Sequence, residues 1–264
     1  MESPYLDDPL RGRFDTWLRE ACDRCMPPLT FPEVRKGVRA LSSLYVEKRA
    51  EKSLAQRSLD GAGKRAAFAT CYAPLHFLTL HHGLREIDSD WLGRDPRSKR
   101  LVDLGGGTGA AGAALATALP APVPILAVDR SGWALGEARR TYAAFGLSSR
   151  AIRGALPRAL PRPQAGDIWV AGWSVNECDE RTRSALLDAF ESASGAGVRV
   201  LIAEPLAGPA APWWADWCER LGPLGFGSAT IRQRIELPAW LRKLDVAAGL
   251  DHRTLGARLL WGPK

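Results

Sequence analysis

The residues with the clearest chemical meaning form a glycine-rich segment, Leu101-Val-Asp-Leu-Gly-Gly-Gly-Thr-Gly109. An apolar run ends in this segment and an alanine-rich stretch follows it, which predicts a strand, a sharp turn and a helix. Gly105, Gly106 and Gly107 let the backbone turn and approach a ligand where a Cβ atom would clash. The start of the helix also offers unpaired N–H groups. The segment therefore predicts a binding site for a small molecule.

Two carboxylates flank this turn and indicate which ligand it binds. Asp103 lies two residues before the first glycine, where we expect it to face the mouth of the turn. A carboxylate there repels a pyrophosphate, but it can receive the amino group of S-adenosylmethionine (SAM), directly or through water. Asp129 ends the next predicted strand and can accept both hydroxyls of an adenosine ribose, with Arg130 beside it. We therefore predict SAM as the cofactor.

Two other interpretations of the same residues stay open. The spacing Gly105-x-Gly107-x-x-Ala110 also satisfies a looser dinucleotide-binding pattern. Asp103 and Asp129 can also serve only to cap turns at strand ends.

A second group of candidates follows the fourth predicted strand, in Trp173-Ser-Val-Asn-Glu177. Ligands of open α/β sheets bind beyond the carboxyl ends of the strands, so we expect Trp173 and Ser174 to border the cofactor. Asn176 and Glu177 are candidates for binding or orienting the methyl acceptor, although capping of the next helix explains Asn176 equally well. Tyr72 is a further catalytic candidate if its helix covers the cleft, and ordinary packing is the alternative. A general base is needed only if the acceptor loses a proton, so O, N and C acceptors all stay open.

The elements that position these residues follow from hydrophobic periodicity. Residues 1–98 are predicted to form a helical segment that covers the site, and residues 99–264 a SAM-binding core in which strands and helices alternate. The fold class is thus α/β, with the Rossmann-like sheet of class I SAM methyltransferases. The predicted strands are 100–104, 124–129, 150–153, 167–173, 198–203, 230–237 and 254–261, and the predicted helices of the core end near 119, 145, 192, 221 and 248.

Composition sets the broad class of the protein. The chain has 264 residues and a formal net charge of +7, which suits one soluble α/β domain with an added segment and is compatible with an RNA partner. The first residues do not form a secretory signal, and prolines interrupt the one long uncharged stretch, so we expect no membrane span and a cytoplasmic location. Cys22 and Cys25 have metal-ligand spacing but lack a second pair, so no metal is predicted.

Two further clusters bear on the methyl acceptor. Six arginines and no acidic residue lie between Arg139 and Arg162, which makes this segment the best candidate for phosphate contacts, with a solvated basic surface as the alternative. Trp213, Trp214 and Trp217 can wall a pocket for a small aromatic or apolar acceptor, although core packing is the more frequent fate of such residues.

The chain also resembles the methyltransferase-like proteins of the mitochondrial small ribosomal subunit and their bacterial relatives. The resemblance implies a SAM fold and a link to small-subunit rRNA or ribosome assembly. Mitochondrial members carry a cysteine cluster after the fifth strand, where this chain has Pro205-Leu-Ala-Gly-Pro-Ala-Ala-Pro-Trp-Trp214. The matching segments are Leu41-Ser-Ser-Leu-Tyr45, Arg65–Pro74, Leu101–Gly109, Trp173–Glu177 and Leu201–Pro205.

Three hypotheses on function follow. The first is a SAM-dependent methyltransferase that acts on small-subunit rRNA or takes part in ribosome assembly. The second is a small-molecule methyltransferase of specialised metabolism, and the third is a SAM-binding assembly factor without catalysis.

Overall fold

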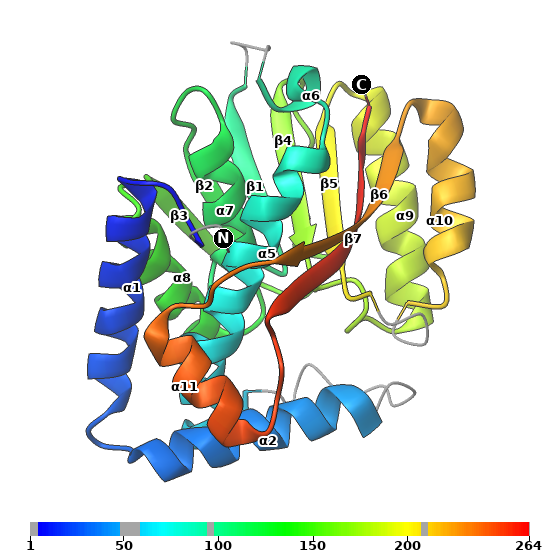
Figure 1. Ribbon diagram of the computed structural model, residues 1–264. Helices are drawn as coiled ribbons and strands as arrows, with labels where there is room; N and C mark the ends of the chain where they lie inside the picture. The colour runs from blue at the N-terminus through cyan, green and yellow to red at the C-terminus, as the bar shows by residue number, and fades with distance from the viewer. Residues whose placement is uncertain (1–4, 48–58, 94–97, 207–210, 264) are drawn as a thin grey trace.

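A seven-stranded sheet forms the centre of the protein, with strand order β3-β2-β1-β4-β5-β7-β6 (Figure 1). The computed structural model describes residues 5–47, 59–93, 98–206 and 211–263. Neighbours among β1 to β5 are parallel, whereas β7 runs antiparallel to both β5 and β6. This is the Rossmann-like fold of class I methyltransferases, as the sequence predicts. The strands are β1 (Arg100–Leu104), β2 (Ile125–Asp129), β3 (Ser149–Arg153), β4 (Asp167–Gly172), β5 (Arg199–Glu204), β6 (Gly227–Arg234) and β7 (Thr254–Gly262).

Helices cover both faces of the sheet and create two cores. Alternate side chains of a strand point to opposite faces, so Leu101 of β1 packs with one core and Val102 with the other. The first core lies under α5 (Ala73–Gly83), α7 (Ala110–Ala118) and α8 (Gly132–Ala144). The second lies under α9 (Glu180–Gly195) and α10 (Trp214–Leu221). The sheet is therefore buried on both sides, which explains why its central strands are almost wholly apolar.

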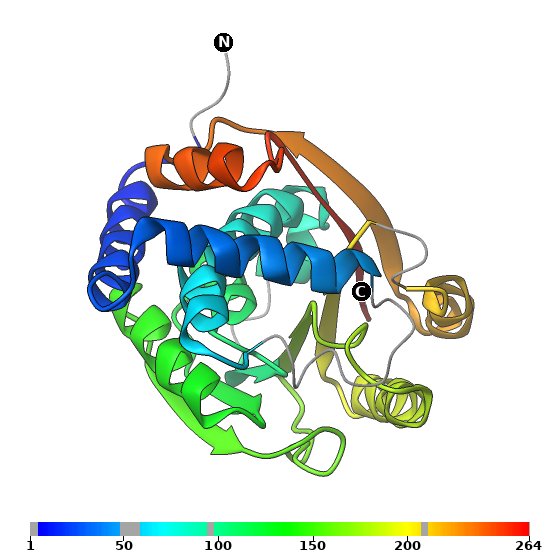
Figure 2. The ribbon, with the colours of Figure 1, turned by 90° about the horizontal axis from the view of Figure 1, so that it is seen from below.

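Further helices gather at the edge of the sheet where β4 points (Figure 1). Seen from below, α2 (Phe31–Glu47) crosses this edge, with α11 (Ala239–Ala248) beside it (Figure 2). Arg39 of α2 donates hydrogen bonds to the carbonyls of Ala247 (3.1 Å) and Ala248 (3.1 Å), which joins the two helices. Residues from both ends of the chain therefore cover the edge at which ligands of this fold bind.

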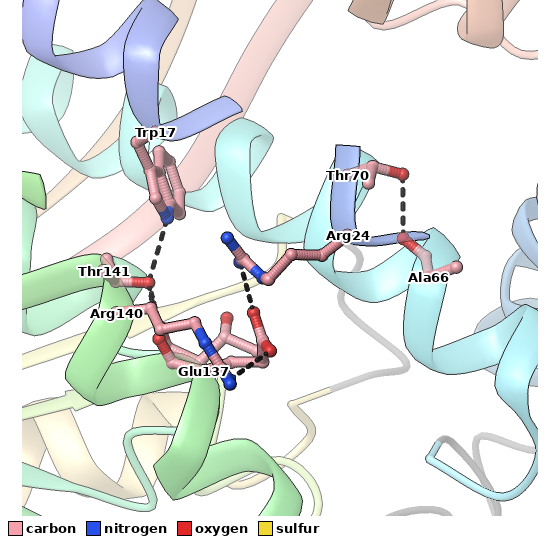
Figure 3. Close-up of polar contacts among 8 residues, drawn as sticks. Trp17, Arg24, Ala66, Thr70, Glu137, Arg140 and Thr141 are labelled. Atoms are coloured by element: carbon pink, nitrogen blue, oxygen red, sulfur yellow. Dashed lines mark hydrogen bonds and ion pairs between the residues drawn. The ribbon is translucent and has the colours of Figure 1, made fainter. Parts of the chain in front are cut away.

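The first helix, α1 (Leu10–Cys25), is tied to α8 by polar side chains (Figure 3). The indole of Trp17 donates to the hydroxyl oxygen of Thr141 (3.0 Å), a bond that is buried. Near the surface, Arg24 pairs with Glu137 at 2.8 Å. The N-terminal segment is thus fixed to the core at a helix that borders the glycine-rich turn.

The predicted elements agree with the structure apart from a few boundaries. The sixth strand begins at Gly227 and ends at Arg234, three residues earlier than the predicted segment 230–237 at each end. Helices α1 and α6 (Ser89–Gly93) were not predicted individually. Among the described residues, no helix has the length and apolar character needed to cross a membrane. The division of the chain at residue 98 stays a prediction.

Candidate cofactor and acceptor site

The glycine-rich turn links β1 to α7 in a conformation that depends on glycine. Gly105 and Gly107 have φ values of +65° and +53°, in the left-handed region that side chains rarely adopt. A Cβ atom at Gly105 would lie 2.7 Å from the Cβ of Ser174, so the end of β4 fills the space there. At Gly107 the nearest atom to a Cβ would be a ring carbon of Phe68 at 4.0 Å, which leaves room above the backbone. The turn is thus closed to a Cβ atom at Gly105 but has room for one at Gly107.

Asp103 lies behind the turn, not at its mouth, which corrects the expectation from the sequence. The residue shares a face of β1 with Leu101 and is fully buried between the turn and helices α7 and α8. Its Oδ2 accepts hydrogen bonds from the Tyr142 hydroxyl (2.6 Å) and the Gly112 amide (3.2 Å). Its Oδ1 is buried and has no hydrogen-bond partner among the described residues. Burial raises the pKa of this carboxyl to about 6, although both hydrogen bonds lower it.

Asp129 ends β2 beside the turn, as predicted. Its Oδ2 accepts the amide of Gly107 (3.0 Å) and its Oδ1 the amide of Ser131 (2.7 Å). Burial raises the pKa of Asp129, and these two backbone bonds oppose the rise. The carboxylate therefore holds the turn and the start of α8 together, which is the capping role that the sequence left open. Each oxygen keeps a lone pair for a further donor such as a ribose hydroxyl.

Trp173 follows β4 with its side chain on an unexpected face. Strand alternation would place it with Trp169 and Ala171, which pack in the second core. Its φ of +54° instead turns the indole toward the first core, where it stacks on His76 of α5. The two ring centroids are 4.1 Å apart and the rings are nearly parallel, at 4°. Positive φ is uncommon outside glycine and concentrates at functional sites.

A π-helical turn, Phe68–Tyr72, covers the open part of the glycine turn. It lies between α4 (Ala62–Ala67) and α5 in one continuous helical stretch. Such turns are frequent at functional sites, because the extra residue redirects side chains. Phe68 faces Gly107, whereas the Tyr72 hydroxyl donates to the carbonyl of Val38 in α2 (3.4 Å). The predicted catalytic role of Tyr72 stays a prediction, and its hydroxyl is directed at α2.

The turn after β4 is held by Glu204, a residue that the sequence analysis did not single out. Glu204 ends β5 and is fully buried. Its Oε1 accepts the amides of Val175 (2.9 Å) and Asn176 (3.1 Å), while its Oε2 has no hydrogen-bond partner among the described residues. Burial raises the pKa of Glu204 well above its usual range. The segment that carries Asn176 and Glu177 is therefore held in place by the buried side chain of Glu204.

The two predicted acceptor residues lie on this segment. The side-chain Oδ1 of Asn176 is buried and has no hydrogen-bond partner among the described residues. Capping of α9 falls to Asp179, whose carboxylate accepts the amide of Thr182 (2.8 Å). Glu177 is half-buried, and burial together with the nearby charge of Asp129 raises its pKa to about 7, which Arg130 partly opposes. Glu177 thus lies near Asp129 and Arg130. Ser174 lies at the start of the segment and donates to the carbonyl of Leu104 (2.9 Å).

The tryptophan cluster and the arginine cluster, which both bear on the methyl acceptor, differ in their exposure to solvent. Trp213, Trp214 and Trp217 are buried in the second core, where Trp217 meets Phe190 of α9 edge to face at 5.9 Å. The tryptophans therefore pack a core, which was the commoner of the two expected fates. The arginines at positions 139, 140, 150, 153, 158 and 162 are all exposed.

Two features at the front of the turn can serve a ligand. The backbone at Gly107 has room for an added Cβ atom, and the Asp129 carboxylate lies beside it. Phe68, His76 and Trp173 form an aromatic cover next to Gly107. Together these features can bind a nucleoside and shield it from water.

No protein-family model matches the chain, and no curated protein matches it in sequence. Its fold is similar to solved structures. They include mitomycin 7-O-methyltransferase, at 13% identity over 97% of this chain and 69% of that chain, with a TM-score of 0.48. The precorrin 8W decarboxylase of Methanobacterium thermoautotrophicum is 20% identical over 66% of this chain and 87% of that chain, with a TM-score of 0.44. The ribosomal protein L11 methylase of Lactobacillus delbrueckii subsp. bulgaricus is 14% identical over 72% and 78%, with a TM-score of 0.40. Identities and TM-scores this low identify neither an activity nor a substrate.

Proposed function

We propose that this protein is a SAM-dependent methyltransferase. The observation that carries the proposal is the glycine turn at the end of β1, open at Gly107 and bordered by the Asp129 carboxylate at the end of β2. SAM would supply an electrophilic methyl group on a sulfonium centre. The protein would supply binding, alignment and a dry site for an in-line displacement.

Each side chain of the site has a specific part in this proposal. Asp129 accepts the ribose hydroxyls, with Arg130 beside it, and the backbone at Gly105, Gly106 and Gly107 lies against the amino acid chain. Asp103 holds the turn in shape from behind, through its hydrogen bonds with the Gly112 amide and the Tyr142 hydroxyl. Trp173 and Ser174 border the cofactor from β4, while Asn176 and Glu177 face the acceptor.

Calorimetric titration with SAM and with S-adenosylhomocysteine tests the proposal. Asp129→Ala should weaken the binding of both at least about tenfold, because a charged group's hydrogen bonds contribute roughly 1.5–3 kcal/mol. Asp179→Ala removes a carboxylate that caps a nearby helix and should leave the affinity unchanged. Unchanged affinity in Asp129→Ala would contradict the ribose role, and binding of NAD in place of SAM would overturn the cofactor assignment.

For the acceptor we propose RNA, with small-subunit rRNA as the first candidate. The supporting observation is the exposure of all six arginines on α8, β3 and the following loop, the part of the fold that also carries Asp129 and Arg130. Arg140 pairs with Glu137, whereas Arg139, Arg150, Arg158 and Arg162 form no ion pair with a described carboxylate. Free guanidinium groups suit phosphates. Burial of the three tryptophans removes the feature that favoured a small aromatic acceptor.

RNA binding can be measured by fluorescence anisotropy with a small-subunit rRNA fragment at several salt concentrations. Affinity should fall steeply as the salt concentration rises. Removing the charges of Arg150 and Arg158 together should make the slope of log affinity against log salt concentration smaller by about two. Charge removal at Arg220, which pairs with Asp188 and Glu191 on another part of the surface, is the matched control. Salt-insensitive or absent binding would contradict an RNA acceptor. Methyl transfer to the bound RNA would exclude a non-catalytic assembly factor.

A further inference from the structure

A histidine–aspartate pair lies at the start of β7, outside the residues considered so far. The ring Nδ1 of His252 lies 2.5 Å from Oδ1 of Asp245, and the backbone amide of His252 donates to Oδ2 of the same carboxylate (2.8 Å). Asp245 is buried at 4% exposure, whereas the side chain of His252 keeps 32% of its surface exposed. A carboxylate can only accept, so Nδ1 carries the proton and Nε2 is left as the basic nitrogen. This is the arrangement in which a carboxylate orients an imidazole for proton transfer.

The sheet topology brings this pair to the ligand-binding edge. Strand β7 is antiparallel to β5, with Arg258 opposite Glu204, so β7 begins where the parallel strands end. His252 precedes β7 by two residues, and Thr254–Ala257 pair with β6 beyond the end of β5. His252 therefore lies past the edge that holds Glu204 and Trp173, on the side toward which the parallel strands point. Although Gly105 and His252 are far apart in the sequence, the fold places both on the side of the sheet toward which the parallel strands point.

Contacts of α11 and α5 place the pair beside the cover of the site. Asp245 lies on α11, whose Trp240 donates to the carbonyl of Thr70 in the π-helical turn (3.1 Å). His76, one helical turn beyond the π segment, is close enough to His252 for their charges to interact. Burial lowers the pKa of His76 to about 3, and His252 adds to the effect. His76 is therefore a neutral ring stacked on Trp173, and the carboxylate-paired His252 lies on the same side of the fold, with part of its ring open to solvent.

We propose that His252, oriented by Asp245, is the general base that accepts the proton of a hydroxyl-bearing methyl acceptor. This inference rests on the proposed function. The acceptor oxygen would bond to the methyl carbon while the methyl–sulfur bond breaks and leaves its electron pair on sulfur. The hydroxyl proton passes to Nε2 of His252, and the imidazolium is stabilised by Asp245. A ribose hydroxyl of RNA and the hydroxyl of a small molecule share this chemistry.

The proposal can be tested without a known acceptor. The probe is a SAM analogue in which a nitrogen mustard replaces the sulfonium, so that an aziridinium carbon occupies the methyl position. The Nε2 lone pair of a facing histidine attacks that carbon, and the carbon–nitrogen bond opens with its electrons going to the ring nitrogen. Peptide mass spectrometry should locate the adduct on His252 in the wild-type protein.

Variants separate a catalytic pair from a purely structural contact. His252→Gln should lose the adduct, and Asp245→Asn should form it roughly tenfold more slowly, with S-adenosylhomocysteine affinity kept in both. In nitrogen-15 NMR spectra, Asp245→Asn should also lose the fixed Nδ1–H tautomer of His252. The matched control is Asp251→Asn, which removes an exposed carboxylate paired with Arg253 in the same loop and should change neither readout.

Each outcome has a definite meaning. An adduct on His76, on Glu177 or elsewhere, with S-adenosylhomocysteine still bound, overturns the role of His252 and leaves the proposed function intact. Failure of the wild-type protein to bind S-adenosylhomocysteine overturns the proposed function itself. Once an adduct on His252 is found, competition by a ribose-containing RNA or by simple phenols shows which hydroxyl source fits the site.

Discussion

The Tyr142 hydroxyl donates a 2.6 Å hydrogen bond to Oδ2 of Asp103, so two fully buried residues of α8 and β1 are joined directly behind the glycine turn. The preceding residue on α8, Thr141, donates to the carbonyl of Thr108 within the turn (2.7 Å). A Cβ atom at Gly109 would lie 2.9 Å from the Tyr142 ring. Helix α8 thus determines the shape of the turn from behind.

Tyr142→Phe should destabilise the protein more at pH 8 than at pH 5. The pKa of Asp103 is raised to about 6, so its proton is held more tightly in the folded than in the unfolded state, and stability falls as pH rises from about 4 to 6. Without the hydrogen bond from Tyr142, the pKa of Asp103 rises further. The fall in stability with rising pH then continues to a higher pH than in the wild-type protein. We expect a cost of about 1.5–3 kcal/mol at pH 8 and less at pH 5, measured by urea unfolding.

Tyr5→Phe provides the matched control for this substitution. It also removes a tyrosine–aspartate hydrogen bond, to Asp15, but that bond is exposed. Tyr5→Phe should lower the free energy of unfolding only slightly, and by the same amount at pH 5 and at pH 8. Equal costs for both variants at pH 8 would contradict the role given to the buried pair.

Gly107→Ala should reduce cofactor affinity far more than it reduces stability. The left-handed backbone makes the alanine cost about 1–2 kcal/mol, but among the described residues, its chain neighbours aside, no atom lies closer than 4.0 Å to the new Cβ. That Cβ would stand where the ligand approaches the turn. Thermal unfolding should therefore show a modest loss, and calorimetry at least about a tenfold loss of S-adenosylhomocysteine affinity.

Gly12→Ala is the control for that experiment. Gly12 lies on α1, and its Cβ would meet nothing within 4 Å. The alanine should stabilise the helix by up to about 1 kcal/mol and leave affinity unchanged. If Gly107→Ala binds as tightly as Gly12→Ala, the open side of the turn is not the ligand site.

Glu204→Gln should make the protein less sensitive to alkaline pH. Because the folded pKa of Glu204 lies well above that of the unfolded chain, stability falls as pH rises from about 4.5 toward the folded pKa. Glutamine keeps the oxygen that accepts the amides of Val175 and Asn176 and has no proton to lose. The free energy of unfolding should match wild type near pH 5 and exceed it by pH 9.

The comparison for this series is Glu86→Gln, which changes an exposed side chain. Its stability should follow the wild-type pH profile. A Glu204→Gln profile parallel to wild type would show that Glu204 is ionised in the folded protein.

Strands and helices of the core were predictable because their apolar periodicity is local. The sixth strand was shifted because Ile235 and Leu237 are buried core residues that extend the apolar pattern beyond the strand end. Its true end is set by antiparallel pairing of Arg234 with Thr254, which the local pattern does not encode.

The position of Asp129 beside the turn was predictable, because it follows from the end of a single strand. The direction of Asp103 was missed although strand alternation places it on the face of Leu101, away from the mouth. Trp173 could not be oriented, because its positive φ overrides the alternation. Tyr142, Glu204 and His252 were missed because the groups that they contact come close to them only in the folded chain.

The attachment of the glycine turn to α8 also bears on the thermodynamics of ligand capture. Thr141 and Tyr142 hold the turn from below the site, independently of the aromatic cover above it. Under the proposed function, movement of Phe68 and its helix would admit the cofactor without unravelling the turn. The turn is therefore preorganised, so little conformational entropy is lost there on association, and the entropic cost of binding falls mainly on the cover.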